Sequence, residues 1–148
     1  MAVTPLHVWG WSQEIEMQPI LESYVGEKLQ KTSARYDIID FEGPTCYVEL
    51  KCRKAKDKNG YTVTSKTHDS WLMPASKIEY ADRQEKRVFL FYRFEADKTL
   101  WVIDYKRGML ADLQTVRPIW HSARSLHYYI PADRWTRLEV VTEDVVVE

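Results

Sequence analysis

Two stretches near residue 40 alternate hydrophobic and polar side chains, the pattern typical of β-strands. They are residues 36–42 and 46–52, and the turn-forming sequence Gly43-Pro44-Thr45 lies between them, so we predict a β-hairpin. Two later stretches, 88–92 and 100–105, are almost continuously apolar, as strands buried on both faces are. We expect these two to form the centre of a sheet.

A spacing of three to four residues between apolar positions predicts a helix over residues 12–31, with Ser12 as its N-cap. Pro19 and Gly26 weaken this helix, because an interior proline removes a backbone donor. The predicted buried stripe consists of Ile15, Pro19, Leu21, Glu22, Val25 or Gly26, and Leu29. A second, short helix is predicted after Pro74, carrying Ile78, Tyr80 and Ala81.

The remaining segments carry weaker patterns. We expect a polar loop over 53–60, extended residues at 61–64, 70–73 and 128–130, and helical turns over 110–116 and 131–138. Helices that alternate with groups of strands in this order predict an α/β or α+β fold rather than an all-β fold.

The composition is that of one ordinary globular domain spanning residues 1–148, with a short acidic end over 142–148. The chain is 45% hydrophobic and 29% charged, and no linker or internal repeat interrupts it. A net charge of −1 excludes a histone-like protein that coats nucleic acid by bulk charge. Any anion-binding surface must therefore be local.

Cys46 and Cys52 lie on one predicted strand, about 20 Å apart at the usual strand rise, and cannot bridge each other. They alternate with Val48 and Leu50 as small buried hydrophobes, which favours a reducing compartment. The sequence shows no leader pattern and no apolar run near the ~18 residues of a membrane span. We therefore expect a cytoplasmic protein without a membrane partner.

The polar face of the hairpin carries the candidate chemistry. Tyr47, Glu49 and Lys51 point away from the apolar face, because successive side chains alternate across a strand. A three-residue turn places Ile39 opposite Glu49 and brings Asp37 opposite Lys51, whereas a two-residue turn brings Asp40 onto this face instead. Two converging carboxylates would suit a hard cation such as Mg²⁺, and a lysine beside them could orient an attacking water.

An acidic residue ahead of a hairpin, followed by Glu-x-Lys on its second strand, resembles the PD-(D/E)xK nuclease superfamily. The matching segments are Tyr36-Asp37-Ile38-Ile39 and Tyr47-Val48-Glu49-Leu50-Lys51-Cys52-Arg53. Their cadence is close to that of phage nucleases and Holliday-junction resolvases, although Tyr36 stands where the family signature has proline. The resemblance implies a restriction-endonuclease-like fold, in which helices flank a mixed central sheet.

The resemblance also implies site roles for individual residues. Asp37 and Glu49 would bind Mg²⁺ or Mn²⁺, Lys51 would be the catalytic lysine, and Glu22 on the first helix would be an accessory metal ligand. Glu14 and Glu27 are weaker candidates for that accessory place. The activity implied is metal-dependent hydrolysis of phosphodiester bonds, with DNA preferred and RNA possible, and dimers are common among such enzymes.

A cluster of basic residues follows Glu49 and predicts a track for backbone phosphates. Its members are Arg53, Lys54, Lys56, Lys58 and Lys66. Lys77 and the pair Lys106-Arg107 could add contacts.

Several other chemistries lack their motifs. His121 and His127 are not in a zinc-ligand spacing, His68-Asp69 belongs to no serine triad, and no glycine-rich phosphate loop occurs. Two alternatives to a nuclease stay open. One is a catalytically inactive module of the same fold that binds nucleic acid or a protein partner, and the other is an inhibitor or accessory protein of viral origin.

Overall fold

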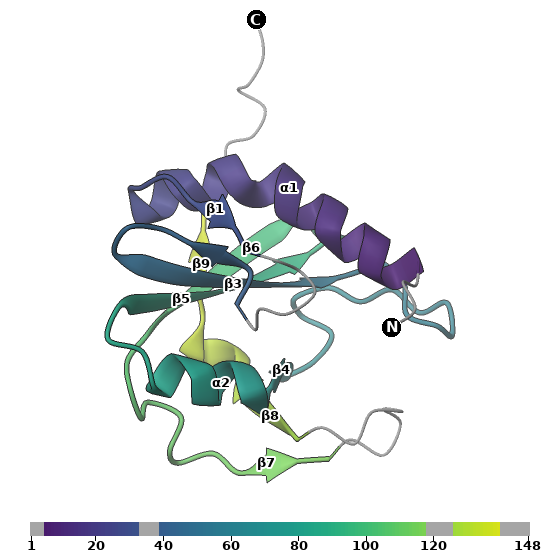
Figure 1. The fold of residues 1–148 in the computed structure, drawn as a ribbon. Coiled ribbons are helices and arrows are strands. Elements are labelled where there is room, and N and C mark those ends of the chain that lie inside the picture. The colour runs from purple at the N-terminus through teal and green to yellow at the C-terminus, as the bar shows by residue number, and fades with distance from the viewer. Residues whose placement is uncertain (1–4, 33–38, 118–125, 140–148) are drawn as a thin grey trace, which may run out of the picture.

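The computed structural model describes residues 5–32, 39–117 and 126–139. It is a single-domain mixed α/β fold built from two helices and two sheets (Figure 1). The helices are α1 (Pro5–Val25) and α2 (Ala75–Asp82), and a 3₁₀ turn covers Ala132–Arg134. The strands are β1 (Gln30–Lys31), β2 (Phe41–Glu42), β3 (Cys46–Arg53), β4 (Ser70–Pro74), β5 (Arg87–Phe94), β6 (Thr99–Tyr105), β7 (Thr115–Val116), β8 (His127–Pro131) and β9 (Thr136–Leu138).

The larger sheet has six strands in the order β1-β2-β3-β5-β6-β9. All its neighbours are antiparallel except β3 and β5, which run parallel over eight residue pairs. Parallel neighbours need a crossover, and here the chain between β3 and β5 contains β4 and α2. The predicted central strands are confirmed as β5 and β6.

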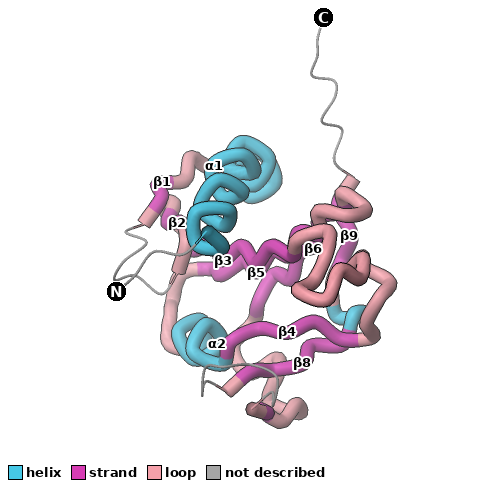
Figure 2. Tube along the Cα trace, turned by 90° about the vertical axis from the view of Figure 1, so that its right-hand side faces the viewer, coloured by secondary structure: helices cyan, strands magenta, loops and turns pink. Residues whose placement is uncertain are grey.

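Each face of this sheet is covered by a different layer (Figure 2). Helix α1 packs on one face through Met17 and Leu21, which meet Val48 and Phe91 of the sheet. Helix α2 and the smaller sheet, β4-β8-β7, cover the other face, with Ile78 of α2 in the same core as Leu90 and Tyr92. Because β3 is buried on both sides, any polar side chain in its middle must find a partner.

Helix α1 is shifted toward the N-terminus from its predicted range of 12–31. It begins at Pro5 and ends at Val25, because Gly26 adopts a φ of 81°, the left-handed conformation that ends many helices. Pro19 lies inside the helix on its exposed side, one turn after Ile15, which is itself 65% exposed. The lost hydrogen bond therefore lies on the solvent side of the helix, where water can replace it. No helix among the described residues is long and apolar enough to cross a membrane.

In the C-terminal third the predicted short helix over 110–116 is wrong, and the turn of helix predicted over 131–138 is confirmed only in its first part. Residues 106–113 form successive turns, residues 115–116 form β7, and only residues 132–134 are helical, as a single 3₁₀ turn. The chain then extends into β9, which pairs with β6. The predicted strand over 61–64 is reduced to one isolated bridge between Lys56 and Thr62 in the described chain.

Candidate functional site

The turn between β2 and β3 decides which aspartate lies beside Glu49. The backbone N–H of Gly43 donates to the carbonyl of Cys46 at 2.8 Å, and Phe41 faces Val48. This is the two-residue turn, and the three-residue alternative is wrong. The regular pairing ends at Phe41, because the next residue, Asp40, donates its backbone N–H to the same Val48 that faces Phe41. Asp40 is the aspartate whose charge acts on Glu49. Asp37 lies outside the described residues.

Asp40 holds the hairpin together where the β2–β3 ladder stops. Its backbone N–H donates to the carbonyl of Val48 at 3.1 Å, and its carboxylate Oδ2 accepts the backbone N–H of Leu50 at 2.8 Å. Its own carbonyl accepts the backbone N–H of Thr32 at 3.0 Å. The side chain thus takes the place of a strand partner and is fixed against β3.

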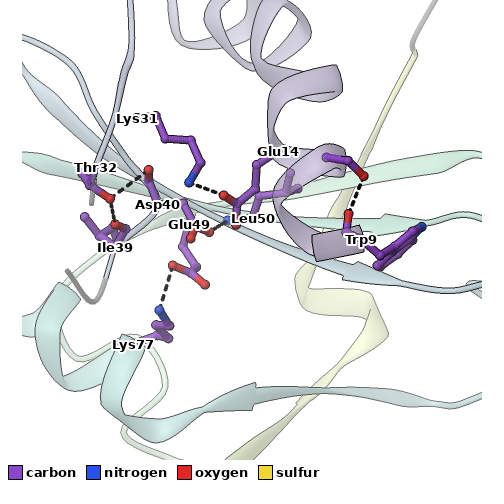
Figure 3. A network of polar contacts seen from close by, with 10 residues as sticks. Trp9, Glu14, Lys31, Thr32, Ile39, Asp40, Glu49, Leu50 and Lys77 are labelled. Carbon is purple, nitrogen blue, oxygen red and sulfur yellow. Dashed lines mark hydrogen bonds and ion pairs between the residues drawn. The ribbon is translucent and has the colours of Figure 1, made fainter. Parts of the chain in front are cut away.

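Glu49 is buried between the large sheet and α2. Its side chain is 6% exposed, and its Oε1 lies 3.3 Å from the ammonium Nζ of Lys77 on α2 (Figure 3). Burial raises the pKa of Glu49 well above its usual value, and the negative charge of Asp40 raises it further, against the opposing charge of Lys77. Glu49 is therefore a carboxyl group that takes up a proton readily unless a cation is close.

Glu14 joins this group from helix α1. It is a buried residue, and Lys31 forms an ion pair with it. Burial, and after it the charge of Asp40, raises the pKa of Glu14 to about 7. Figure 3 shows Glu14, Asp40 and Glu49 close together, with Lys31 and Lys77 on their flanks. Asp40 therefore neighbours two carboxyl groups, Glu14 from α1 and Glu49 on β3, and these two come from opposite faces of the sheet.

Glu22, the predicted accessory ligand, has a different role. Its Oε2 accepts the backbone N–H of Leu29 at 2.8 Å and the amide of Gln18 at 3.4 Å, and the bond from Leu29 lowers the pKa of Glu22. The structure thus ties Glu22 to the chain that follows α1 and does not bring it to Asp40 and Glu49. Glu27 likewise holds the hairpin turn, accepting the backbone N–H of Thr45 at 2.8 Å.

The sequence contained a signal for Glu14 that the predicted stripe missed. Glu14, Met17 and Leu21 are spaced by three and four residues, and all three are buried. The predicted stripe began at Ile15, which is 65% exposed. Its starting point was wrong by one position, which exchanged Glu14 for Glu22 as the carboxylate facing inward.

Lys51 lies two residues after Glu49 on the same face of β3. It is half-buried, and its burial, followed by the charge of Arg53, lowers the pKa of its ammonium group. The charge of Glu49 acts in the opposite direction. The side chain is thus a lysine that gives up its proton more readily than an exposed one does.

The predicted phosphate track begins directly after Lys51. Arg53 is half-buried, whereas Lys54, Lys56, Lys58 and Lys66 are all exposed. The ammonium of Lys54 lies 5.4 Å from the ring centre of Trp9, which joins the start of this loop to the N-terminal part of α1. Lys56 donates to the hydroxyl of Thr62 at 3.2 Å. The four exposed lysines remain accessible to an anionic partner.

The carboxylate oxygens of Glu14 and Glu49 are of the kind that a hard cation binds, but each glutamate is ion-paired, Glu14 with Lys31 and Glu49 with Lys77. The Oε1 atoms of Glu14 and Glu49 are buried, and neither accepts a hydrogen bond of normal geometry from the described residues. Within these residues no three His, Cys, Asp or Glu side chains are gathered as a ready metal-binding group. Carboxylate oxygens are the ligands that Mg²⁺ and Mn²⁺ prefer, and the neighbouring carboxylates here are Asp40 with Glu49 and Asp40 with Glu14.

The other candidate residues lie apart from this group or outside the described chain. Cys46 is buried and Cys52 half-buried, and both are free thiols. His127 is buried in β8, and His121 lies outside the described residues. Lys106 and Arg107 are exposed beyond the end of β6.

The chain matches no protein-family model. No curated protein matches it either.

Proposed function

We propose that the protein is a metal-dependent nuclease that hydrolyses phosphodiester bonds, with DNA preferred over RNA. The observation that carries the proposal is Asp40 beside the buried Glu49, with Lys51 on the same face of β3 and Glu14 also next to Asp40. Burial and the charge of Asp40 raise the pKa of both glutamates, and such perturbed groups are concentrated at functional sites.

The order of elements also supports the proposal. Helix α1 is followed by the antiparallel meander β1-β2-β3, then by β4 of the smaller sheet and α2, and then by β5 parallel to β3. The family that the hairpin sequence resembles has a core of a helix, a three-stranded meander, a helix and a further strand. A restriction-endonuclease-like fold is accordingly part of the proposal.

The residues divide the chemistry between them. Asp40 and Glu49 would hold Mg²⁺ or Mn²⁺, with Glu14 in the accessory place that the sequence assigned to Glu22. The bound metal would supply Lewis-acid stabilisation of the phosphate and a water of lowered pKa. Lys51 orients the attacking water or neutralises charge that develops on the phosphorus, and its lowered pKa suits proton exchange.

The exposed lysines of the loop after β3 have a separate task. Each ammonium that contacts a phosphate releases condensed counterions, so binding weakens as salt rises. These contacts carry no sequence information and position the backbone in the site.

A catalytically inactive module that binds nucleic acid or a protein partner is the second candidate. The ion pairs Lys31–Glu14 and Lys77–Glu49 favour it, because they neutralise two of the three acids without a metal. The two functions differ in whether divalent metal binds among the acids.

A cleavage assay separates the two. The substrates are labelled single-stranded, duplex and branched DNA, and RNA, each incubated with Mg²⁺ or Mn²⁺. The proteins compared are the wild type, Glu49→Gln and Lys51→Met, and Glu22→Gln is the control for loss of a carboxylate. Cleavage that Glu49→Gln and Lys51→Met abolish and Glu22→Gln retains supports the nuclease. Binding without cleavage by a folded wild type, with no metal-induced rise in melting temperature, supports the module.

A further inference from the structure

One aromatic side chain stands out on the surface beside the lysines. Tyr61 is 72% exposed, more than any other large hydrophobic residue in the described part of the chain. Most aromatic residues of the chain are packed in the two cores instead. The ring of Tyr61 therefore buries little of its surface in the fold and is open to a partner.

The loop that carries Tyr61 is built as a tight hairpin over residues 55–63, here called the Tyr61 hairpin. The backbone N–H groups of Asp57 and Val63 donate to the carbonyls of Tyr61 and Ala55, at 2.9 and 2.8 Å. Gly60 has a φ of +85°, as in three-residue turns that close with a left-handed residue. The ring is thus presented on an ordered support rather than on a loose loop.

Both ends of this segment are tied to the turn between β5 and β6. The backbone N–H of Ala55 donates to Glu95 at 2.9 Å, and the N–H of Ser65 donates to Asp97 at 3.0 Å. In Figure 1 the chain between β3 and β4 extends past the N-terminal end of α1. A partner can therefore reach the Tyr61 hairpin and the end of β3 together.

The charges around Tyr61 favour an anion. Lys56 and Lys58 lie within the Tyr61 hairpin, and Lys66 follows it, all three exposed. The acid among them, Asp57, uses its Oδ1 to accept the backbone N–H groups of Asn59 and Tyr61, at 2.9 and 3.0 Å. An exposed ring among cations is the combination that binds unpaired nucleotides, since the ring stacks on a base while the cations hold the phosphates.

We propose that the Tyr61 hairpin is a nucleic-acid contact that selects unpaired bases. The ring of Tyr61 stacks on a base that has a free face, and Lys56, Lys58 and Lys66 bind the phosphates on either side. Bases inside a regular duplex have both faces covered, so the preferred substrate is a single strand or a branch with unpaired bases. This inference rests on the proposed function only in taking nucleic acid as the partner.

Binding in EDTA tests the inference without any cleavage. The probe is a single-stranded oligodeoxynucleotide containing 2-aminopurine, compared with a blunt duplex of the same sequence. Stacking of 2-aminopurine on the Tyr61 ring should quench its fluorescence when the wild type binds. Tyr61→Ala should abolish this quenching and weaken single-strand binding about 5- to 150-fold, the change that a stacked base contributes. Tyr61→Phe should retain both the affinity and the quenching. Tyr129→Ala, which removes another exposed tyrosine, serves as the matched control.

Four results would overturn the inference. They are no binding by the folded wild type, unchanged single-strand binding by Tyr61→Ala, an equal loss of single-strand and duplex affinity in Tyr61→Ala, or Tyr61-dependent binding to vesicles of anionic phospholipid with none to the oligonucleotide. A protein that binds single strands through Tyr61 and cleaves nothing with Mg²⁺ or Mn²⁺ keeps this inference and refutes the nuclease. Cleavage that does not change in Tyr61→Ala on any single-stranded or branched substrate, together with unchanged binding, refutes the inference and keeps the nuclease.

Discussion

Asp40 lies beside Glu49 at the open end of the β2–β3 hairpin, and its charge helps to raise the pKa of Glu49. Asp40 cannot turn away, because its Oδ2 accepts the backbone N–H of Leu50. The fold therefore keeps a carboxylate beside a buried glutamate, which is unfavourable unless a proton or a cation is bound.

Asp40→Asn should lower metal-dependent cleavage by about 100-fold or more, because a lost metal ligand removes several kcal/mol of transition-state stabilisation. Asparagine keeps an oxygen that can accept the N–H of Leu50, so the variant should fold. Asp40→Ala should lose that bond too and be about 1–3 kcal/mol less stable. Cleavage rates and urea unfolding measure the two effects, with the exposed Asp133→Asn as control. Normal cleavage by Asp40→Asn would remove Asp40 from the site.

The stability of the wild type should fall as the pH rises from about 4.5 through 7. The folded protein holds the proton of Glu14 with a pKa of about 7, against 4.5 ordinarily, so folding is favoured by proton uptake between these values. The contribution is complete below pH 4.5 and lost above 7, and it amounts to about 1–3 kcal/mol. Glu14→Gln should flatten this part of the profile measured by urea unfolding. An equally steep profile in Glu14→Gln would show that another group is responsible.

Glu14→Gln and Glu22→Gln should have different effects on activity. Glu14 lies beside Asp40, so its neutralisation should lower cleavage and weaken the stabilisation by Mn²⁺. Glu22 binds the backbone of Leu29, so Glu22→Gln should lower the melting temperature and leave cleavage nearly unchanged. Cleavage rates and thermal unfolding with and without Mn²⁺ distinguish them. Loss of cleavage in Glu22→Gln alone would restore the accessory role predicted from the sequence.

The sequence was sufficient to place Glu49 and Lys51 on one face, because strand alternation depends only on neighbouring residues. It left the choice between Asp37 and Asp40 open, since Gly43-Pro44-Thr45 suits turns of different length. Glu14 could not be chosen over Glu22, because the side of a helix that is buried is fixed by the sheet against which it packs. The sequence predicted mixed α/β structure but not the order of the strands in the sheets, because strand order depends on contacts between residues far apart in the chain.

The smaller sheet shows this limit most clearly. Strand β4 pairs with β8, so that Trp71 faces Ile130 across almost 60 intervening residues. The short stretch of residues 136–138 becomes a strand because β6 offers an edge, with Trp101 facing Arg137. Local patterns in residues 131–138 predicted a helical turn, and tertiary pairing overrode it.

Lys77→Met should destabilise the protein at pH 8 by about 1–3 kcal/mol, because it leaves the buried Glu49 without its cation. The pKa of Glu49 should rise further, since Lys77 is one of the groups that lower it. Mn²⁺ should stabilise this variant more than the wild type, because the metal no longer competes with the ammonium. Thermal unfolding with and without Mn²⁺ measures both effects, with Lys77→Arg as the charge-preserving control. Equal stabilisation by Mn²⁺ in Lys77→Met and wild type would place metal binding away from Glu49.

Replacing Lys56, Lys58 and Lys66 by glutamine should reduce the salt dependence of DNA binding. Each lysine that neutralises a phosphate contributes about 0.7 to the slope of log affinity against log salt on a single strand and about 0.9 on a duplex. The triple variant should therefore lose up to about 2 units of slope on single strands. Titrations in EDTA at several salt concentrations measure it, with Lys28→Gln, an exposed lysine after α1, as control. Because the exposed side chains of these lysines contribute little to folding, an unchanged slope in a folded triple variant would show that phosphates are bound elsewhere on the protein.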